Sequence, residues 1–223
     1  MQSAAPMNDL LPHLEIGASR EDAETTVLLM HGLGADGHDF ADVAEILCRS
    51  AAPKKWRFVL PHAPEMPVTI NMGMRMPAWY DILDMSQPRE VDWESVAKSQ
   101  AAIVALMETE AAEKIVLAGF SQGAAMAMHV GLRTERPIAG ILMMSGYLLE
   151  SEGQPCPKTT PESPPIGIFH GSADQVVPLS AAERTQDALA DAGFSPTMKI
   201  YQGMEHSVCD EEVRDVFEWL GKI

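Results

Sequence analysis

The sequence is short of positive charge. It contains 16 lysine and arginine residues against 32 aspartate and glutamate residues, which gives a formal net charge of −16. A chain this acidic is repelled by nucleic-acid phosphates and by anionic lipid surfaces, and no basic stripe in the sequence compensates for the excess. We therefore expect no nucleic-acid partner and no stable insertion into a membrane.

Cysteine is also scarce. The three cysteines, Cys48, Cys156 and Cys209, are odd in number and irregularly spaced, which excludes a disulfide framework and fits a reducing compartment. The histidines and cysteines lack the spacing of a zinc site, so we expect no metal and no cofactor. The first residues have no basic segment followed by an apolar core, and no apolar run approaches the length of a membrane span. We expect a cytoplasmic protein.

Short apolar runs alternate with longer helical patterns along the 223 residues, a length typical of one α/β domain. The expected strands cover residues 25–30, 57–61, 114–120, 138–145, 166–170 and 197–202, and the expected helices cover 39–50, 92–113, the segment after Ser121, 179–193 and 209–223. Several strands are apolar on both faces, which is typical of a mostly parallel, doubly wound sheet flanked by helices. We expect a single domain over 25–223, preceded by an N-terminal extension, 1–24, that can supply an edge strand.

Two segments interrupt this alternation. Residues 61–90 form a loop-like stretch that is rich in methionine and proline. Residues 148–165 are rich in proline and polar residues, which predicts an exposed connection. The methionines between Met66 and Met85 either fill the core or line an adaptable apolar site. Neither segment is long enough to form a second domain.

One serine stands between an apolar run and a helical pattern, in the stretch GFSQG at residues 119–123. This stretch matches the G-x-S-x-G nucleophile elbow, in which a sharp turn from strand to helix exposes the serine hydroxyl. Glycines are needed there because larger side chains would collide with their neighbours. A serine that merely caps the helix is the alternative, but it does not explain glycines on both sides. Ser121 is therefore the expected nucleophile.

A serine nucleophile needs a general base and a carboxylate that orients the base. In elbow hydrolases, the chain order is serine, acid, histidine. Of the histidines after Ser121, His129 lies on the helix that begins at the serine, and His170 precedes the best acid. His206, in the loop after the last strand, is the expected base, and Asp174, in the loop after the preceding strand, is the expected acid. An Asx turn and an ordinary loop histidine are the alternatives at these two positions.

A developing oxyanion needs backbone N–H donors. The residue after the nucleophile, Gln122, supplies one of them. The glycine-rich turn HGLG at residues 31–34 follows an early strand, and we expect Leu33 to supply the other. Phosphate binding is an alternative for this turn, but the lysine of a P-loop and the G-x-G-x-x-G spacing are both missing.

Taken together, these motifs resemble the phospholipase/carboxylesterase family of α/β-hydrolases, the group that contains the acyl-protein thioesterases. The similar stretches are HGLGADGHDF, PHAP, PVTINMGMRMPAWYDI, GFSQGAAM, HGSADQVVP and GMEHSVCDEE, and they extend from about Thr25 to the C-terminus. The resemblance implies an α/β-hydrolase fold without a cap domain, and it places the nucleophile, acid and base on Ser121, Asp174 and His206. It also implies that Trp79 lies beside the acyl site, and that a homodimer is one expected assembly.

The expected activity is that of a serine carboxylesterase that hydrolyses short- to medium-chain acyl esters or thioesters through an acyl-enzyme on Ser121. We expect Met74, Met76 and Trp79 to bind the acyl chain, because each buried methylene contributes about 0.8 kcal/mol. One alternative is an acyl-protein thioesterase or lysophospholipase that acts on long chains. Others are a peptidase or lactonase on the same fold and a non-catalytic, hydrolase-like binding module.

Overall fold

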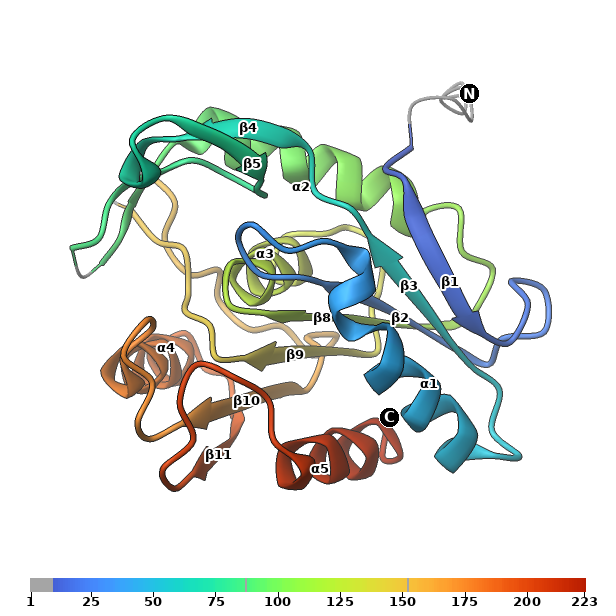
Figure 1. Cartoon of the computed structure of the whole chain (residues 1–223). Helices are drawn as coiled ribbons and strands as arrows, with labels where there is room; N and C mark the ends of the chain where they lie inside the picture. Colours follow the sequence, from blue (N-terminus) through green and yellow to red (C-terminus); the bar gives the residue numbers. More distant parts are fainter. Residues whose placement is uncertain (1–9, 87, 152) are drawn as a thin grey trace.

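A seven-stranded sheet runs through the centre of the computed structural model, which describes residues 10–86, 88–151 and 153–223 (Figure 1). Its strands are β1 (His13–Gly17), β2 (Thr25–Met30), β3 (Trp56–Pro61), β8 (Lys114–Phe120), β9 (Gly140–Met144), β10 (Ile166–Gly171) and β11 (Thr197–Tyr201). They lie in the order β1-β3-β2-β8-β9-β10-β11, and each neighbouring pair is parallel except β1 with β3. The expected mostly parallel sheet is confirmed, and β1 forms its antiparallel edge.

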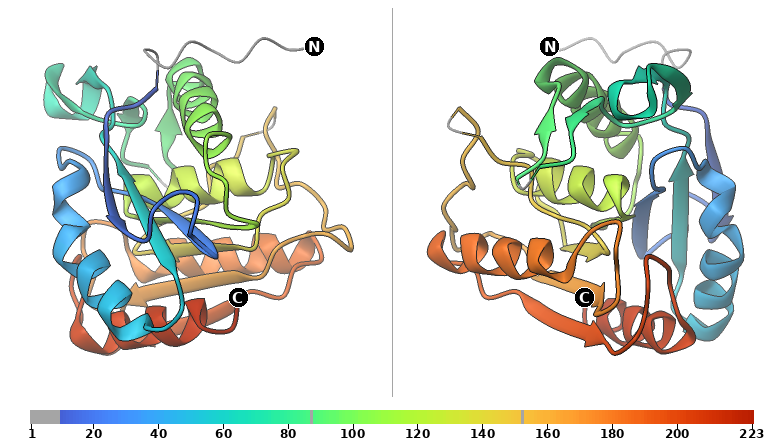
Figure 2. Two further views of the ribbon diagram at one scale, coloured as in Figure 1. Left: turned by 90° about the vertical axis from the view of Figure 1, so that its right-hand side faces the viewer. Right: turned by 60° about the vertical axis from the view of Figure 1, so that its left-hand side comes forward.

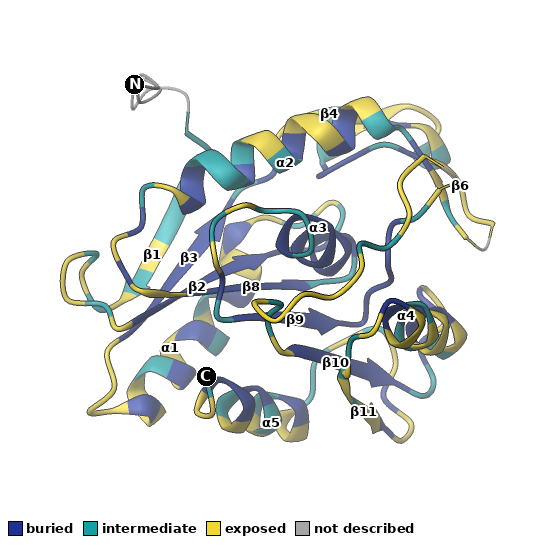
Figure 3. Cartoon of the chain, turned by 180° about the vertical axis from the view of Figure 1, so that it is seen from behind, coloured by how far each residue is buried: buried dark blue, intermediate teal, exposed yellow. Residues whose placement is uncertain are grey.

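Helices cover both faces of the sheet, because most of its strands are buried on both sides (Figure 1). On one face lie α1 (Ala41–Ala51) and α5 (Asp210–Leu220), and on the other lie α2 (Trp93–Met107), α3 (Gln122–Gly131) and α4 (Leu179–Asp191). Figure 3 shows α3 buried along its length, whereas α2, α4 and α5 expose their outer sides. This burial explains why the α3 sequence, QGAAMAMHVG, consists mostly of small and apolar residues.

The expected helices are present with shifted ends, and the largest shift affects the helix expected over 92–113. The observed helix α2 ends at Met107. Beyond it, the buried carboxylate of Glu110 pairs with Arg57 (Glu110 Oε2 to Arg57 Nε, 2.8 Å) and accepts a hydrogen bond from the Thr26 hydroxyl (3.2 Å). Arg57 and Thr26 are distant from Glu110 in sequence. The helical periodicity of residues 92–113 cannot indicate a tertiary contact with them, so it could not locate the end of the helix.

The segment 61–90, expected as a loop, contains two short hairpins. Its elements are β4 (Glu65–Val68), η3 (Thr69–Asn71), β5 (Met74–Pro77), β6 (Ile82–Asp84) and β7 (Glu90–Val91), with β4 paired to β5 and β6 paired to β7. Prolines are tolerated in β4 and β5 because each strand has only one partner and an open edge. Figure 2 shows the β4–β5 hairpin beside α2 in both views.

Two further connections complete the chain. The 3₁₀ turn η2 (Gly37–Phe40) leads from the loop after β2 into α1. The connection from β9 to β10 includes residues 148–165, which in their described part are exposed or half-buried except at Leu148 and Leu149, as a polar and proline-rich stretch predicts. Within the described ranges, no helix is both long and apolar enough to cross a membrane.

The first turn of α5 carries one buried acid, Glu212. Its side chain is fully buried, and this burial raises the pKa of its carboxyl to about 8. The backbone N–H of Cys209 favours the charged form and the carboxylate of Asp215 disfavours it, but burial has the largest effect. Glu212 therefore keeps its proton in the folded chain at pH values where an exposed glutamate has lost it.

We predict that Glu212 makes folding less favourable as the pH rises from about 4.5 to about 8. In this window the folded chain holds a proton that the unfolded chain releases, so the free energy of unfolding falls by up to about 1.4 kcal/mol per pH unit. Glu212→Gln has no proton to release. Its melting temperature near about pH 7.5 should exceed that of the wild type by on the order of 10 °C.

The control for this prediction is Glu211→Gln, because Glu211 is exposed in the same helical turn. Scanning calorimetry should show that Glu211→Gln melts like the wild type throughout this pH range. At about pH 4 and below, glutamate is protonated in both states, and the advantage of Glu212→Gln should disappear. A melting temperature for Glu212→Gln equal to that of the wild type at every pH would contradict the raised pKa.

Candidate active site

Ser121 occupies a strained turn between β8 and α3. Its backbone has φ 54° and ψ −117°, a conformation that residues with a Cβ atom rarely adopt. The flanking glycines allow this turn. A Cβ atom at Gly119 would lie 2.5 Å from the Ala124 nitrogen, and one at Gly123 would lie 2.5 Å from the His31 carbonyl oxygen. The backbone therefore packs too closely here for any other residue type.

The Ser121 hydroxyl is the first member of a hydrogen-bonded chain of three side chains. Its Oγ lies 2.9 Å from Nε2 of His206, and Nδ1 of His206 lies 2.7 Å from Oδ2 of Asp174. The carboxylate accepts a hydrogen bond from the Nδ1–H group of the neutral imidazole, which leaves the lone pair of Nε2 facing the serine hydroxyl. Asp174 is buried, and its Oδ1 accepts the backbone N–H groups of Val176 (2.9 Å) and Val177 (2.8 Å).

These side chains meet because their loops leave the same edge of the sheet. Ser121 follows β8, Asp174 follows β10, and His206 follows β11, and these strands all run in the same direction. In parallel sheets, the loops at the carboxyl ends of the strands form the ligand site. The ring of Phe120 packs against the His206 imidazole, with 4.7 Å between ring centroids. The structure thus brings together the three residues that the chain order selected.

The other two histidines considered as bases have different surroundings. His129 lies far along α3, and its Nε2 is 3.1 Å from Oε1 of Gln100 on α2. His170 is fully buried in β10, and its Nε2 donates to the Val177 carbonyl oxygen (2.8 Å). Both rings are engaged with neighbours other than Ser121.

Two backbone amides near Ser121, those expected to bind an oxyanion, have no acceptor in the described part of the chain. Within the described residues, the N–H groups of Leu33 and Gln122 donate to no other group. A Cβ atom added at Gly32 would lie 3.5 Å from the Ser121 Cβ atom, so the turn that carries Leu33 lies beside the elbow. The turn is held by His31, whose Nδ1 donates to the Gly32 carbonyl (2.8 Å) and whose Nε2 accepts the N–H of Ala63 (3.0 Å).

Trp79 lies beneath this turn rather than on the surface. Its side chain has no exposed area, and a contact between Trp79 and an acyl substrate stays a prediction. Its indole Nε1 instead donates to the His31 carbonyl oxygen (2.9 Å). The Gln122 side chain accepts the N–H of Trp79 (2.8 Å) and donates to the carbonyl of Tyr80 (2.7 Å). Sequence reasoning missed these side-chain contacts of Gln122, because no motif records them.

The two methionines expected at the acyl site lie on β5. Met74 is 58% exposed, so its side chain is open to a ligand. Met76 is half-buried, and its Sδ would lie 3.8 Å from a Cβ atom added at Gly34 in the turn after β2. The Gly34 N–H donates to the Pro77 carbonyl oxygen (2.9 Å), which joins the β4–β5 hairpin to this turn. Met76 therefore lies beside the turn that carries Leu33, one of the proposed oxyanion donors.

The structure also gathers three metal-ligating side chains that the sequence spacing did not indicate. Ligand atoms of Asp36, His38 and His62 all lie within 4.8 Å of one another. However, Nδ1 of His62 accepts the N–H of Gly37 (3.1 Å). The proton of the neutral His62 ring therefore sits on Nε2, and no lone pair is left for a metal ion. The hydrogen bond between Gly37 and His62 instead connects the end of β3 to the 3₁₀ turn before α1.

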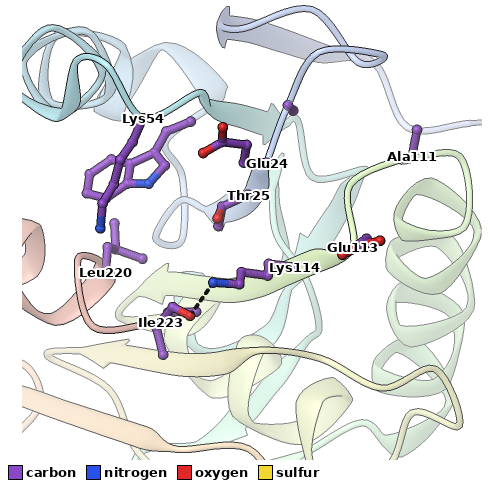
Figure 4. Close-up of a pocket in the computed structure, with 10 residues that line it drawn as sticks. Glu24, Thr25, Lys54, Ala111, Glu113, Lys114, Leu220 and Ile223 are labelled. Carbon is purple, nitrogen blue, oxygen red and sulfur yellow. Dashed lines mark hydrogen bonds between the residues drawn. The ribbon is translucent and has the colours of Figure 1, made fainter.

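A cavity of about 460 Å³ lies at the amino-terminal ends of the central strands, opposite the ends that carry Ser121 (Figure 4). It is lined by Lys114, the first residue of β8, whereas Ser121 follows the last residue of that strand. Two lysines in its wall already have partners: Lys54 donates to the Gly221 carbonyl (2.8 Å) and Lys114 to the Ile223 carbonyl (2.7 Å). This cavity is separate from the hydrogen-bonded chain at Ser121.

Known proteins are similar to this chain in sequence and in fold. The sequence profile of the phospholipase/carboxylesterase family matches residues 11–223. The chain belongs to this family. The match includes β1, so the likeness to the family extends further toward the N-terminus than the start near Thr25 that the motifs indicated.

Individual family relatives are similar over most of their length. Acyl-protein thioesterase 1 of Neurospora crassa is 38% identical over 209 residues, which cover 87% of this chain and 85% of the relative. The protein of the same name from Gibberella zeae is 37% identical over 210 residues, which cover 88% and 89%. Acyl-protein thioesterase 2 of Zea mays, a solved structure, is 27% identical with a TM-score of 0.82 and covers 95% of this chain and 98% of its own.

These similarities establish the class of enzyme. The chain has the α/β-hydrolase fold, and it is a serine hydrolase of the carboxylesterase or thioesterase type. The alternative of a non-catalytic binding module is set aside for the same reason. The acyl chain, the leaving group and the roles of individual residues are separate questions.

We predict that Gly123→Ala lowers kcat/KM for a short p-nitrophenyl ester by on the order of 100-fold. The added Cβ atom would force apart the turn at Ser121 and the turn after β2. Small displacements of reacting groups have effects of this size on the rate. Gly153→Ala is the control, since no described atom lies within 4 Å of its added Cβ. Steady-state kinetics and thermal melting of both variants would test this. A Gly123→Ala enzyme with wild-type kinetics would show that the elbow does not need close packing.

Proposed function

We propose that the chain hydrolyses short- to medium-chain acyl esters or thioesters by nucleophilic catalysis at Ser121. The observation that carries this proposal is the hydrogen-bonded chain from Asp174 through His206 to a serine held in a strained turn. A serine hydroxyl is a weak nucleophile unless a base removes its proton during attack. His206 Nε2 is within hydrogen-bonding distance of that proton, and Asp174 stabilises the imidazolium that forms.

Acylation follows from this arrangement. The Ser121 oxygen bonds to the carbonyl carbon of the substrate while its proton passes to His206. The carbonyl oxygen becomes an oxyanion, which accepts hydrogen bonds from the backbone N–H groups of Leu33 and Gln122. When the intermediate collapses, the bond to the alcohol oxygen or thiol sulfur breaks, and His206 returns its proton to the leaving group. The product is an acyl-enzyme on Ser121.

Deacylation repeats the same steps with water. His206 removes a proton from a water molecule, whose oxygen bonds to the acyl carbon, and the same two amides bind the second oxyanion. Collapse releases the carboxylic acid and returns the proton to the Ser121 oxygen. Each donor therefore acts twice in one turnover.

The exposed apolar side chains support an acyl substrate. Met72 and Met74 are 93% and 58% exposed on the β4–β5 hairpin, and Val176 is 49% exposed in the turn that follows Asp174. Arg89 donates to the Val176 carbonyl oxygen (2.7 Å), which joins the β6–β7 hairpin to the acid turn. Apolar surface of this kind favours an alkyl chain over a polar acyl group.

A long-chain acyl thioester is the second candidate substrate. The Neurospora crassa and Gibberella zeae relatives are named acyl-protein thioesterases, and the same is true of the Zea mays structure. The net charge of −16 opposes close approach to anionic membranes, where long-chain substrates reside, so we place shorter monomeric substrates first.

We also propose a reducing, cytoplasmic location. The three cysteines are free thiols in the structure, as expected where disulfides do not form. The homodimer implied by the family resemblance stays a proposal of the same kind, which the molar mass in solution would test.

We predict that Ser121→Ala lowers kcat by about 10⁴-fold or more while the fold is retained, because the nucleophile and its base act as a unit. His206→Ala should have a similar effect, and the double variant should be little worse than either single variant. The control is Ser180→Ala, an exposed serine on α4. A fluorophosphonate probe should label Ser121 in the wild type, as peptide mass spectrometry would show. Turnover by Ser121→Ala above a few per cent of wild type would refute the assignment.

We predict that kcat/KM rises with acyl chain length. Two added methylenes contribute about 1.6 kcal/mol, which corresponds to about tenfold in kcat/KM until the apolar surface is covered. The measurement is a series of p-nitrophenyl esters from about two to about sixteen carbons and a matched thioester series. Met76→Ala should flatten the dependence, and Ile46→Ala, exposed on α1 on the other face of the sheet, should leave it unchanged.

The shape of this dependence separates the candidates. A maximum at short to medium chains supports the first proposal, and a continued rise to the longest thioesters supports the second. Equal rates at all chain lengths would refute the role of the apolar surface but not that of Ser121. A peptide amide hydrolysed faster than every ester would show that the enzyme is a peptidase.

A further inference from the structure

The turn that carries the acid receives a hydrogen bond from outside the central sheet. Arg89, the residue before β7, donates from its Nη2 to the Val176 carbonyl oxygen (2.7 Å). This carbonyl belongs to the same peptide group as the N–H of Val177, and that N–H donates to Oδ1 of Asp174 (2.8 Å). One peptide group therefore joins the positive charge of Arg89 to the negative charge of Asp174.

The contacts of the Arg89 guanidinium are not with acidic side chains. Its Nη2 bonds a carbonyl, its Nη1 lies 3.3 Å from the Met85 sulfur, and no carboxylate in the described part of the chain pairs with it. Its Nε is buried and has no partner among the described residues. A buried, unpaired N–H group makes folding less favourable. In a chain with a net charge of −16, an arginine placed in this way indicates a role other than charge pairing.

An aromatic ring fixes the position of Arg89. The Cζ atom of Arg89 lies 4.9 Å from the centroid of the Tyr147 ring, an arrangement in which the cation is attracted to the aromatic face. Tyr147 is buried, and its hydroxyl lies 2.7 Å from that of Tyr80, which is also buried. The carbonyl of Tyr80 in turn accepts a hydrogen bond from the Gln122 side chain (2.7 Å). The ring beneath Arg89 is therefore connected to the start of α3.

We propose that Arg89 is a positioning residue for Asp174 and acts through the peptide group between Val176 and Val177. Its hydrogen bond holds this peptide in the orientation in which the N–H meets Oδ1 of Asp174, and Oδ2 is left for His206 (2.7 Å). A donor on the carbonyl oxygen also polarises the peptide, which strengthens the hydrogen bond made by its N–H. In this role Arg89 does not contact the substrate. The proposal rests on the roles proposed for Asp174 and His206.

The first test compares two substitutions at residue 89. Arg89→Met keeps an unbranched stem but removes the charge and every donor, whereas Arg89→Lys keeps the charge and an N–H donor. Arg89→Met should lower kcat for a short p-nitrophenyl ester by about tenfold, with KM within about twofold of wild type, because small displacements of a catalytic group have effects of this size. Arg89→Lys should keep kcat within about threefold of wild type.

Arg184→Met is the control for net charge. Arg184 is exposed on α4 and lines the same small cavity as Arg89 and Tyr147. Both methionine variants therefore remove one positive charge from the same region of the surface. Arg184→Met should leave kcat and KM unchanged, since the proposed path runs through the hydrogen bond of Arg89 and not through the general field of the surface.

The ring of Tyr147 allows a second test that leaves Arg89 in place. Tyr147→Phe keeps the ring and should lower kcat by less than about twofold. Tyr147→Leu removes the ring and should lower kcat by about three- to fivefold, because Arg89 then loses its support. In an Arg89→Met background, Tyr147→Leu should have little further effect, since residues that act along one path are not additive.

Proton NMR spectra of the free enzyme report on both ends of the path. A weaker hydrogen bond moves an amide proton to higher field, so the Val177 N–H resonance should move in that direction in Arg89→Met. The low-field resonance of the His206 Nδ1 proton should shift or broaden in the same variant. Both resonances should be retained in Arg89→Lys. A side chain with a purely structural role would change the melting temperature without moving either of them.

Three results would overturn the proposal. One is a wild-type kcat for Arg89→Met in a sample that is folded at the assay temperature. Another is an equal loss of kcat in Arg184→Met, which would assign the effect to net charge. If Arg89→Met does not fold at that temperature, equal kcat values for Tyr147→Leu and Tyr147→Phe would overturn it. All three are compatible with an inactive Ser121→Ala, whereas an active Ser121→Ala would refute the proposed function itself.

Discussion

The site depends on the close backbone contact between the start of α3 and the end of β2. A Cβ atom at Gly123 would overlap the carbonyl oxygen of Met30 and lie 2.5 Å from that of His31. Because backbone meets backbone at this point, the chain must turn abruptly at Ser121, which explains its positive φ. The turn after β2 is held against the elbow by the same contact. The same backbone contact therefore fixes the positions of the proposed nucleophile, Ser121, and of the turn that carries the proposed donor Leu33.

The remaining residues of the site follow from the direction of the strands. In a parallel sheet, all the loops at one edge face the same side, so residues far apart in sequence converge there. The edge at β8, β9 and β10 carries Ser121, Ser145 and His170 in successive positions, and two of these residues have positive φ. Two residues with unfavourable backbone conformations therefore lie at the carboxyl ends of the adjacent strands β8 and β9. The apolar side chains buried between the sheet and the helices on both faces stabilise the fold and offset the cost of this strain.

Chain order and loop position were enough to select Ser121, Asp174 and His206 from the sequence, because each lies in the loop after a strand that the sequence pattern indicated. Contacts between distant segments could not be selected in this way. Glu110, three residues beyond the end of α2, pairs with Arg57, and the buried indole of Trp79 donates to the carbonyl of His31. Periodicity describes one segment at a time, whereas these features require two segments to be placed together.

Gln122 shows how these long-range contacts serve the proposed chemistry. Its backbone N–H is one proposed oxyanion donor, and its side chain accepts the N–H of Trp79. The Trp79 indole then donates to the carbonyl of His31, at the start of the turn that presents Leu33, the other proposed donor. Two hydrogen bonds and one rigid indole therefore connect the two donors and limit how far they can move apart. Preorganised donors stabilise charge without rearranging as it develops, so a fixed path of this kind between Gln122 and Leu33 is what the proposed oxyanion site requires.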